Sequence, residues 1–237
     1  MQSQFGLINL WSQGDWVTRL VASLLLIMSL ASWMVIIIKA LDIRTASMQS
    51  KNIEGFWHSA DMAEGLTKLG DQPLNPFRNL AIEGREAAAH HRQTKPQLHD
   101  TLDISDWLTR CLRNSIDEAT AHLQGGLAIL ASVGSTAPFV GLFGTVWGIY
   151  HALLAIGLSG QSTIDKVAGP IGEALIMTAL GLAVAIPAVL GYNALVRYNK
   201  TVIAKLNRFA HDLHAYYTTG ARVNAASSGN VVTMKKG

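Results

Sequence analysis

An ionisable residue, Glu173, stands inside the apolar stretch GPIGEALIMTALGLAVAIP at residues 169–187. A charge near the middle of a bilayer costs roughly 2.5–3.5 kcal/mol on insertion scales, so such a group needs a partner or a function. A carboxyl group can take up and release a proton, and intramembrane acids commonly serve proton relays. Glu173 is therefore a candidate proton carrier. The alternative is a protonated carboxyl group that only makes a packing hydrogen bond.

The glutamate belongs to a chain whose composition favours a membrane protein. Its 237 residues are 49% hydrophobic and 15% charged, whereas soluble domains are about 25% charged. Three stretches, 20–38, 123–164 and 174–196, contain no Lys, Arg, Asp or Glu. Because a span needs about 20 apolar residues, the sequence predicts an all-α membrane protein with three transmembrane helices at 20–38, 124–158 and 165–196.

The orientation of the spans is predicted from the basic residues. Ten of the 19 Lys and Arg residues lie in 39–123 and seven follow residue 196, while Arg19 and Lys166 are the other two. Basic loops stay inside, so 39–123 and 197–219 are predicted to be cytoplasmic. The N-terminus (1–19) and the short loop 159–164 are then external, or periplasmic in a Gram-negative cell. We expect no cleavable signal peptide, because the first residues lack a basic start.

The cytoplasmic segments have helical patterns of their own. Apolar residues at helical spacing predict a helix that runs straight into the second span, and others predict that the third helix continues beyond the membrane. Breakers at 72–77 and 94–96 leave room for helices at about 45–69 and 77–93. The cytoplasmic part is therefore expected to be a bundle of long helical extensions. The tail, 220–237, is small and polar, which predicts disorder.

Helix geometry places Glu173 near the middle of the membrane. Ser162 and Asp165 fit a capping box at the start of the third helix, and Glu173 follows Ser162 by about 16 Å of helix. Thr145, on the second span, lies about 18 Å inward from Gly157. The two side chains are therefore expected at the same depth.

The second span also carries a face of small residues. Pro138, Gly141, Thr145, Gly148 and Ala152 recur at steps of three and four, and Gly144 with Gly148 forms a GxxxG pair. Such faces let helices approach closely in lipid.

No Lys, Arg or Asp in the other two predicted spans can pair with Glu173. A charged partner would have to come from another chain. His151, six residues outward from Thr145, is either an interfacial or packing residue or a proton relay.

An enzymatic function is disfavoured. Ser135 and His151 are about 24 Å apart along one helix, too far for a nucleophile and its base. The chain contains no GxSxG, HExxH or GxxxxGK[ST] motif. We expect no catalytic site, cofactor or metal, and the single cysteine, Cys111, is interpreted as a small buried residue.

The segments GLFGTVWGI and GPIGEALIMTALGLAVAIPAVLGYN resemble the MotA/TolQ/ExbB proton-channel family over about residues 127–193. The resemblance implies a homo-pentamer in a bacterial inner membrane, whose second and third helices enclose a pore that holds an ExbD-like single-span subunit. Such a complex uses the proton-motive force to energise TonB for uptake of iron-siderophores and vitamin B12. A TolQ-like subunit of the Tol-Pal outer-membrane maintenance system is the alternative. A MotA-like stator would have four spans.

The resemblance also assigns residues. The family's pore glutamate corresponds to Glu173 and its two pore threonines to Thr145 and Thr178. On an ideal helix Glu173 and Thr178 differ by about 140°, so both cannot point at one axis, and Thr178 is expected to face a neighbouring helix. Pro187, beyond both residues, removes a helical hydrogen bond to Ala183 and is a candidate kink.

Overall fold

The computed structural model describes residues 15–72, 74–93, 103–159 and 164–220. In these residues the regular structure is helical, without a strand. The elements are α2 (Trp16–Gln49), the 3-10 turn η1 (Ser50–Asn52), α3 (Ile53–Trp57), α4 (Met62–Leu69), α5 (Pro76–Gln93), α6 (Ile104–Gln124), α7 (Leu127–Ser159) and α8 (Ile164–Thr219). The all-α fold is confirmed.

The chain divides into two compact units. Unit 1 comprises residues 1–43 and 124–198, and unit 2 comprises 44–123 and 199–237. Among the described residues, three helical stretches are long and apolar enough to cross a membrane, and they include α2, α7 and α8. This confirms the three predicted spans.

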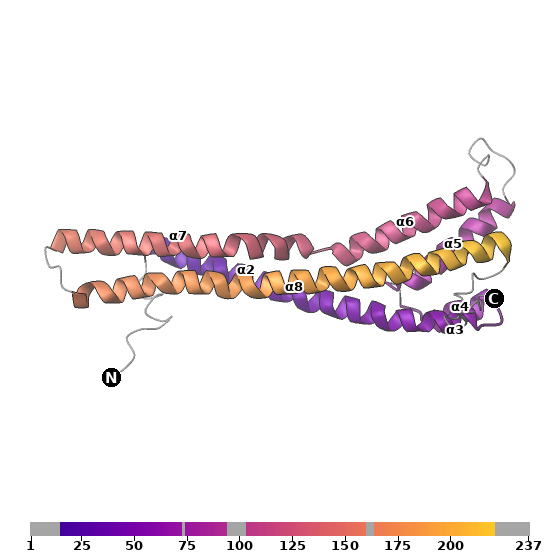
Figure 1. Cartoon of the computed structure of the whole chain (residues 1–237), viewed down its shortest axis with the longest axis horizontal. Coiled ribbons are helices and arrows are strands. Elements are labelled where there is room, and N and C mark those ends of the chain that lie inside the picture. The colour runs from indigo at the N-terminus through magenta and orange to yellow at the C-terminus, as the bar shows by residue number, and fades with distance from the viewer. Residues whose placement is uncertain (1–14, 73, 94–102, 160–163, 221–237) are drawn as a thin grey trace, which may run out of the picture. The chain divides into compact units, whose positions relative to one another are not determined.

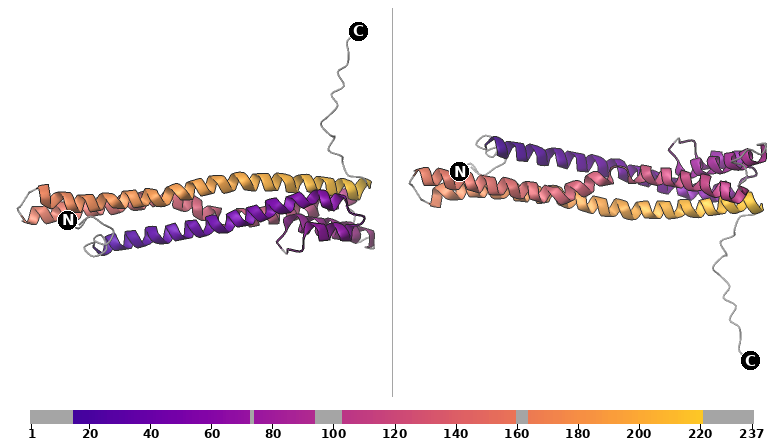
Figure 2. Two further views of the ribbon diagram at one scale, coloured as in Figure 1. Left: turned by 90° about the horizontal axis from the view of Figure 1, so that it is seen from below. Right: turned by 90° about the horizontal axis from the view of Figure 1, so that it is seen from above.

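In unit 1, α7 and α8 run antiparallel in close contact, and α2 lies alongside them (Figures 1 and 2). A Cβ added at Gly134 would meet Val189, and one added at Gly148 would meet Ala174. Residue numbers therefore increase along α7 in the direction in which they decrease along α8. Small residues fill this contact, because Ala137, Ala185 and Ala188 are all buried. Short side chains therefore form much of the α7–α8 contact.

Many large apolar side chains of unit 1 lie on its outer surface. Exposed examples occur on all three helices: Leu26, Ile27, Leu30 and Met34 on α2, Phe139, Phe143, Val146 and Leu153 on α7, and Leu175, Leu182, Ile186 and Leu190 on α8. In water this surface would be unfavourable, since apolar area exposed to water carries a free-energy cost. Its extent fits contact with lipid or with other transmembrane helices.

Unit 2 has a conventional core of large side chains. The ring of Phe209, on α8, lies 5.4 Å from the ring of Phe56 and 6.2 Å from that of Phe77, both edge-to-face. Leu108 and Leu112 of α6 are buried in the same unit, as the helical spacing of the sequence predicts. Aromatic burial of this kind gives unit 2 the hydrophobic stabilisation of a soluble bundle.

The prediction that the helix at 104–123 runs straight into the second span is wrong. Helix α6 ends at Gln124 and α7 begins at Leu127, and Gly126 between them has a φ of +83°. Only glycine adopts that conformation easily. A Cβ at Gly126 would also lie 3.1 Å from a methyl group of Val35 on α2, so the turn is doubly dependent on glycine.

The predicted single helix at 45–69 is also wrong. The chain passes instead through the end of α2, η1, α3 and α4. Asp61 stops a continuous helix, because its carboxylate accepts a hydrogen bond from the Glu64 amide at 2.7 Å and caps α4. The other predicted helix is confirmed as α5, where the Asn75 side chain accepts hydrogen bonds from the amides of Phe77 and Arg78.

Helix α8 continues without a break from Ile164 to Thr219. Pro187 lies within it and Pro138 within α7, and both helices continue through their prolines. The predicted capping residue Ser162 and the predicted disordered tail from residue 221 lie outside the described residues.

Candidate functional site

The carboxyl group of Glu173 projects from α8 and is half-buried. Among the residues that the structure describes, it makes no hydrogen bond or ion pair. Its sequence neighbour Ala174 is buried against α7, where a Cβ at Gly148 would lie 2.9 Å from the Ala174 methyl group. Glu173 is thus held at the edge of the α7–α8 contact with its carboxyl group free to react.

The Thr145 hydroxyl lies inside the α7–α8 contact. Thr145 is only 6% exposed. Its Oγ1 is 3.1 Å from the Gly141 carbonyl oxygen on its own helix and 3.0 Å from the Ala174 carbonyl oxygen on α8. The contact to Ala174 places Thr145 and Glu173 at nearly the same level, as helix geometry predicts.

Thr178 completes this polar cluster. Its hydroxyl oxygen is 2.5 Å from that of Thr145. A hydroxyl group has one proton and can accept two hydrogen bonds. When Thr178 donates to Thr145, the Thr145 hydroxyl can donate to the carbonyl oxygen of Gly141 or Ala174. Either direction is allowed, and the pair can reverse it by rotating both hydroxyl groups.

The structure therefore brings Thr145 and Thr178 together and leaves Glu173 outside their hydrogen bonds. Thr178 does face the neighbouring helix, as its angle to Glu173 requires. The backbone of Ala174 links the acid to the pair, because it follows Glu173 directly and its carbonyl oxygen contacts Thr145.

The small residues of α7 lie in the tightest part of the helix contact. A Cβ at Gly141 would lie 2.6 Å from the Met177 carbonyl oxygen, and one at Gly181 would lie 2.7 Å from the Ala137 carbonyl oxygen. Both distances are too short for any side chain. A Cβ at Gly144 would approach Val21 on α2 at 3.0 Å, so all three helices of unit 1 meet at this level. Pro138 and Pro187 are half-buried.

The α8 side of this contact escaped the sequence analysis. Gly181 is its central residue, and Ala174, Ala185 and Ala188 continue the same buried face. Their spacing of seven, four and three residues was readable as a second small-residue face that matches the one on α7.

His151 lies on α7 toward α2. Its Nδ1 is 3.1 Å from the Trp147 carbonyl oxygen and its Nε2 is 4.0 Å from a carboxylate oxygen of Asp15. Because only a protonated Nδ1 can donate to a carbonyl, the neutral ring has an unprotonated Nε2 toward Asp15. The ring also stacks at 4.5 Å on Trp147.

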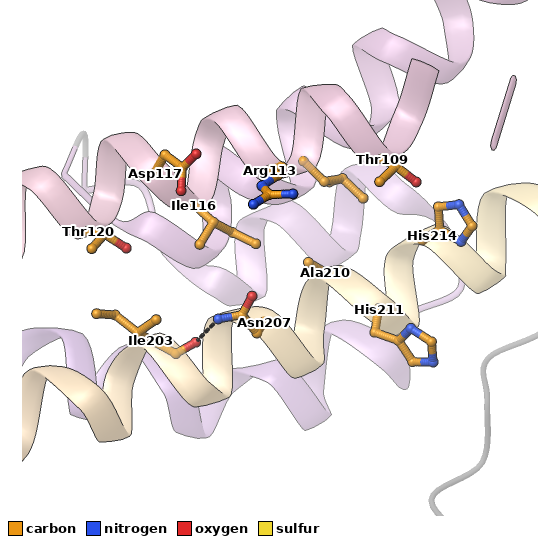
Figure 3. A pocket seen from close by; sticks show the side chains of 11 residues that line it. Thr109, Arg113, Ile116, Asp117, Thr120, Ile203, Asn207, Ala210, His211 and His214 are labelled. Carbon is orange, nitrogen blue, oxygen red and sulfur yellow. Dashed lines mark hydrogen bonds between the residues drawn. The ribbon is translucent and has the colours of Figure 1, made fainter. Parts of the chain in front are cut away.

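One groove lies within unit 2. It has a volume of about 690 Å³ and lies between α6, which contributes Arg113 and Asp117, and α8, which contributes Asn207 and His211 (Figure 3). None of the residues predicted for a proton pathway lines it. The described residues also contain no group of three potential metal ligands.

Comparison with known proteins identifies the family of the chain. Residues 81–208 match the MotA/TolQ/ExbB proton channel family, a range that contains Thr145, Glu173 and Thr178. The chain is 43% identical over 220 residues to "Biopolymer transport protein ExbB" of Xanthomonas campestris pv. campestris (strain B100), covering 90% of this chain and 86% of that protein.

Two further relatives mark the range of the similarity. The protein of the same name from Neisseria meningitidis serogroup A is 40% identical over 208 residues, covering 86% of this chain and 93% of the relative. "Tol-Pal system protein TolQ" of Haemophilus influenzae is 33% identical over 199 residues, covering 82% of this chain and 86% of the relative. With its three membrane-spanning helices and these relatives, the chain belongs to the MotA/TolQ/ExbB proton channel family.

Proposed function

We propose that this chain is an ExbB-like subunit of an inner-membrane motor driven by the proton-motive force, with Glu173 as its proton carrier. The observation that carries the proposal is a carboxyl group in a transmembrane helix with no hydrogen bond or ion pair among the described residues. Intramembrane acids are costly, and they are commonly retained for ion or proton movement.

The complex would contain five copies of this chain, an ExbD-like single-span subunit within their pore and a TonB-like energy transducer. The exposed apolar surface of α7 and α8 offers the area that such assembly requires. With the N-terminus in the periplasm and the C-terminus in the cytoplasm, as the distribution of Lys and Arg favours, the α7–α8 connection faces the periplasm. The energy that the complex takes from the proton-motive force would drive uptake of iron-siderophores and vitamin B12.

Thr145 and Thr178 would assist the proton carrier. Their shared hydrogen bond can reverse, and one of its acceptors is the carbonyl oxygen of Ala174 beside Glu173. A change in the charge of Glu173 alters the electrostatic potential at that carbonyl group. The pair can therefore respond to the protonation of Glu173 by reorienting.

The decisive variant is Glu173→Gln, which keeps the shape and hydrogen bonding of the side chain but cannot carry a proton. In a strain that lacks its own ExbB, we expect the wild-type chain with its partners to restore siderophore uptake and the variant to restore none, at equal assembly. Glu118→Gln, on the exposed face of α6, is the matched control and should behave as wild type. Full uptake by Glu173→Gln would refute the proton-carrier function.

A TolQ-like role in the Tol-Pal system is the second candidate, because a TolQ protein is 33% identical to the chain. The higher identity of 40–43% to ExbB proteins favours the first. The two are separated by expressing the chain in strains that lack either ExbB or TolQ. Restored resistance to detergents without restored siderophore uptake would favour the TolQ-like role.

A further inference from the structure

A second pair of titratable residues lies at the end of unit 1 where α2 begins and α7 ends. It consists of Asp15, directly before α2, and His151 on α7, with 4.0 Å between the Asp15 Oδ2 and the His151 Nε2. Their side chains are 52% and 40% exposed, so protons from outside unit 1 can reach both. The hydrogen bond from Nδ1 to the Trp147 carbonyl oxygen leaves Nε2 as the atom that gains or loses a proton.

The ring and Glu173 lie at almost the same level of the two antiparallel helices. Gly148 contacts Ala174, and His151 is three residues beyond Gly148 while Glu173 is one residue before Ala174. At 1.5 Å per residue these offsets are about 4.5 and 1.5 Å toward the same end of the unit. Their levels therefore differ by only about 3 Å.

Both residues also lie on the sides of their helices that face α2. His151 follows Gly144, which contacts Val21 of α2, by seven residues or about two turns. Glu173 precedes Gly191, where a Cβ would meet Ile36 of α2 at 2.7 Å, by eighteen residues or about five turns. By this helix geometry, His151 and Glu173 both lie on the α2 side of the α7–α8 pair.

From this arrangement we infer that Asp15 and His151 form a proton-loading pair for Glu173, an inference that rests on the proposed function. A proton from outside forms an N–H bond at His151 Nε2, and the Asp15 carboxylate stabilises the resulting imidazolium. The proton then passes through water to a carboxylate oxygen of Glu173, forming an O–H bond as the N–H bond breaks. The imidazole returns to its neutral form and the glutamate becomes neutral.

The surrounding charges favour this direction. The printed neighbours of the His151 ring are the Asp15 carboxylate at 4.0 Å and the rings of Trp147 and Tyr150 on its own helix. Arg19 lies one turn of helix beyond Asp15, and Glu173 lies on α8 at nearly the same level as His151. Imidazole is the side chain that exchanges protons readily near neutral pH. Loading through His151 matters most when protons are scarce outside.

The test measures proton flux into liposomes that contain the complete complex, with a pH-sensitive dye inside, an imposed potential and an external pH series from acidic to alkaline. We expect His151→Gln and Asp15→Asn to lower flux at alkaline external pH by about tenfold, a modest share of what proton-transfer groups contribute. At acidic external pH the flux through both variants should approach that of wild type, because Glu173 can then take protons directly from outside. Glu173→Gln should abolish flux at every pH.

His58→Gln is the matched control. The Nδ1 of His58 contacts the carbonyl oxygen of Glu54, four residues back, as that of His151 contacts Trp147, but His58 belongs to unit 2. The proton flux of this variant should equal that of wild type at every external pH. If His151→Gln follows wild type, or loses the same factor at every pH, while Glu173→Gln abolishes flux, the loading pair is refuted and the proposed function stands. Flux retained by Glu173→Gln would instead refute the proposed function itself.

Discussion

The hydroxyl oxygens of Thr145 and Thr178 lie 2.5 Å apart across the contact of α7 and α8. Thr145 also reaches the carbonyl oxygens of Gly141 and Ala174, and a helical threonine such as Thr178 can in general bond the carbonyl four residues back. The cluster is therefore redundant for stability, although its geometry is specific.

This redundancy predicts that Thr145→Val reduces transport much more than assembly. The variant keeps the volume and removes the hydroxyl group, and Thr178 can then donate to the carbonyl oxygen of Ala174 within α8. We expect siderophore uptake to fall severalfold, with less than about 1 kcal/mol lost in stability. Uptake assays combined with thermal melting of the purified oligomer would measure both effects.

Thr136→Val provides the control for that experiment. Thr136 lies on α7 and its hydroxyl donates to the Ser132 carbonyl oxygen at 2.7 Å, but it has no partner on α8 among the described residues. It should leave uptake unchanged. If Thr145→Val dissociates the complex, Thr145 is a packing residue.

Substitution of Gly141 should instead disrupt the helix contact itself. Even alanine places a Cβ 2.6 Å from the backbone oxygen of Met177, which cannot move without displacing α8. We expect Gly141→Ala to lower the melting temperature and the yield of oligomer, and Gly141→Leu to prevent assembly. Gly157→Ala, on the same helix with no atom within 4 Å of the added Cβ, should be harmless. An equal loss of melting temperature and oligomer yield in Gly141→Ala and Gly157→Ala would contradict the packing role of Gly141.

Much of unit 1 was predictable from the sequence because the requirements of a membrane are strict. Charge-free stretches of sufficient length gave the three spans, and residue spacing gave the depth of Glu173 relative to Thr145. The partner of Thr145 was harder to identify. Its alignment with Thr178 depends on the register of α7 against α8, which is set by the contact of Gly141 with Gly181.

The elements of unit 2 were less predictable, because local side-chain bonds override hydrophobic periodicity there. Asp61 caps α4 and breaks a segment whose spacing suggested one helix. In unit 1, the turn at Gly126 likewise interrupts a helix that the apolar stripe would continue. Asp15 and His151 are far apart in sequence, so only the packing of α2 on α7 reveals their proximity.

The break between α6 and α7 predicts a role for Asn199. Its side-chain amide donates to the Leu123 carbonyl oxygen at 2.8 Å, and the residue is 3% exposed. Asn199→Leu removes this donor and leaves a buried carbonyl oxygen unpaired at the end of α6, which costs about 1–3 kcal/mol. Thermal melting should show that loss. Asn207→Leu, whose amide bonds only within its own helix turn at an exposed position, should cost much less.

The single cysteine predicts a pH dependence. Burial, and secondarily the charge of Glu83, raises the pKa of the Cys111 thiol. Because the thiolate is the reactive form, a raised pKa lowers its fraction at any given pH. Alkylation by iodoacetamide should therefore reach half its maximal rate at higher pH than for an unperturbed thiol.

Glu83→Gln tests the cause of that shift. Removing the negative charge should move the alkylation profile of Cys111 part of the way back to lower pH, because burial is the larger cause and persists. Glu86→Gln, one turn further along α5, is the control and should leave the profile in place. An unchanged profile in Glu83→Gln would exclude the electrostatic contribution.

The last prediction concerns the need for a second protein. Glu173 has no cationic partner among the described residues, and a ring of identical carboxylates would repel if all were ionised, so some members keep their protons. A partner helix with its own carboxyl group could exchange protons with such a ring. A membrane potential supplies about 2.3 kcal/mol per charge per 100 mV for that exchange.

That energy does work only if the partner moves as protons pass. We therefore expect this chain alone in liposomes to give little proton flux under an imposed potential, and its complex with the copurified single-span partner to give flux that Glu173→Gln abolishes. The dye assay described above measures both preparations. Strong flux from the chain alone, lost in Glu173→Gln, would make it a self-sufficient channel in which the gate lies within its own helices.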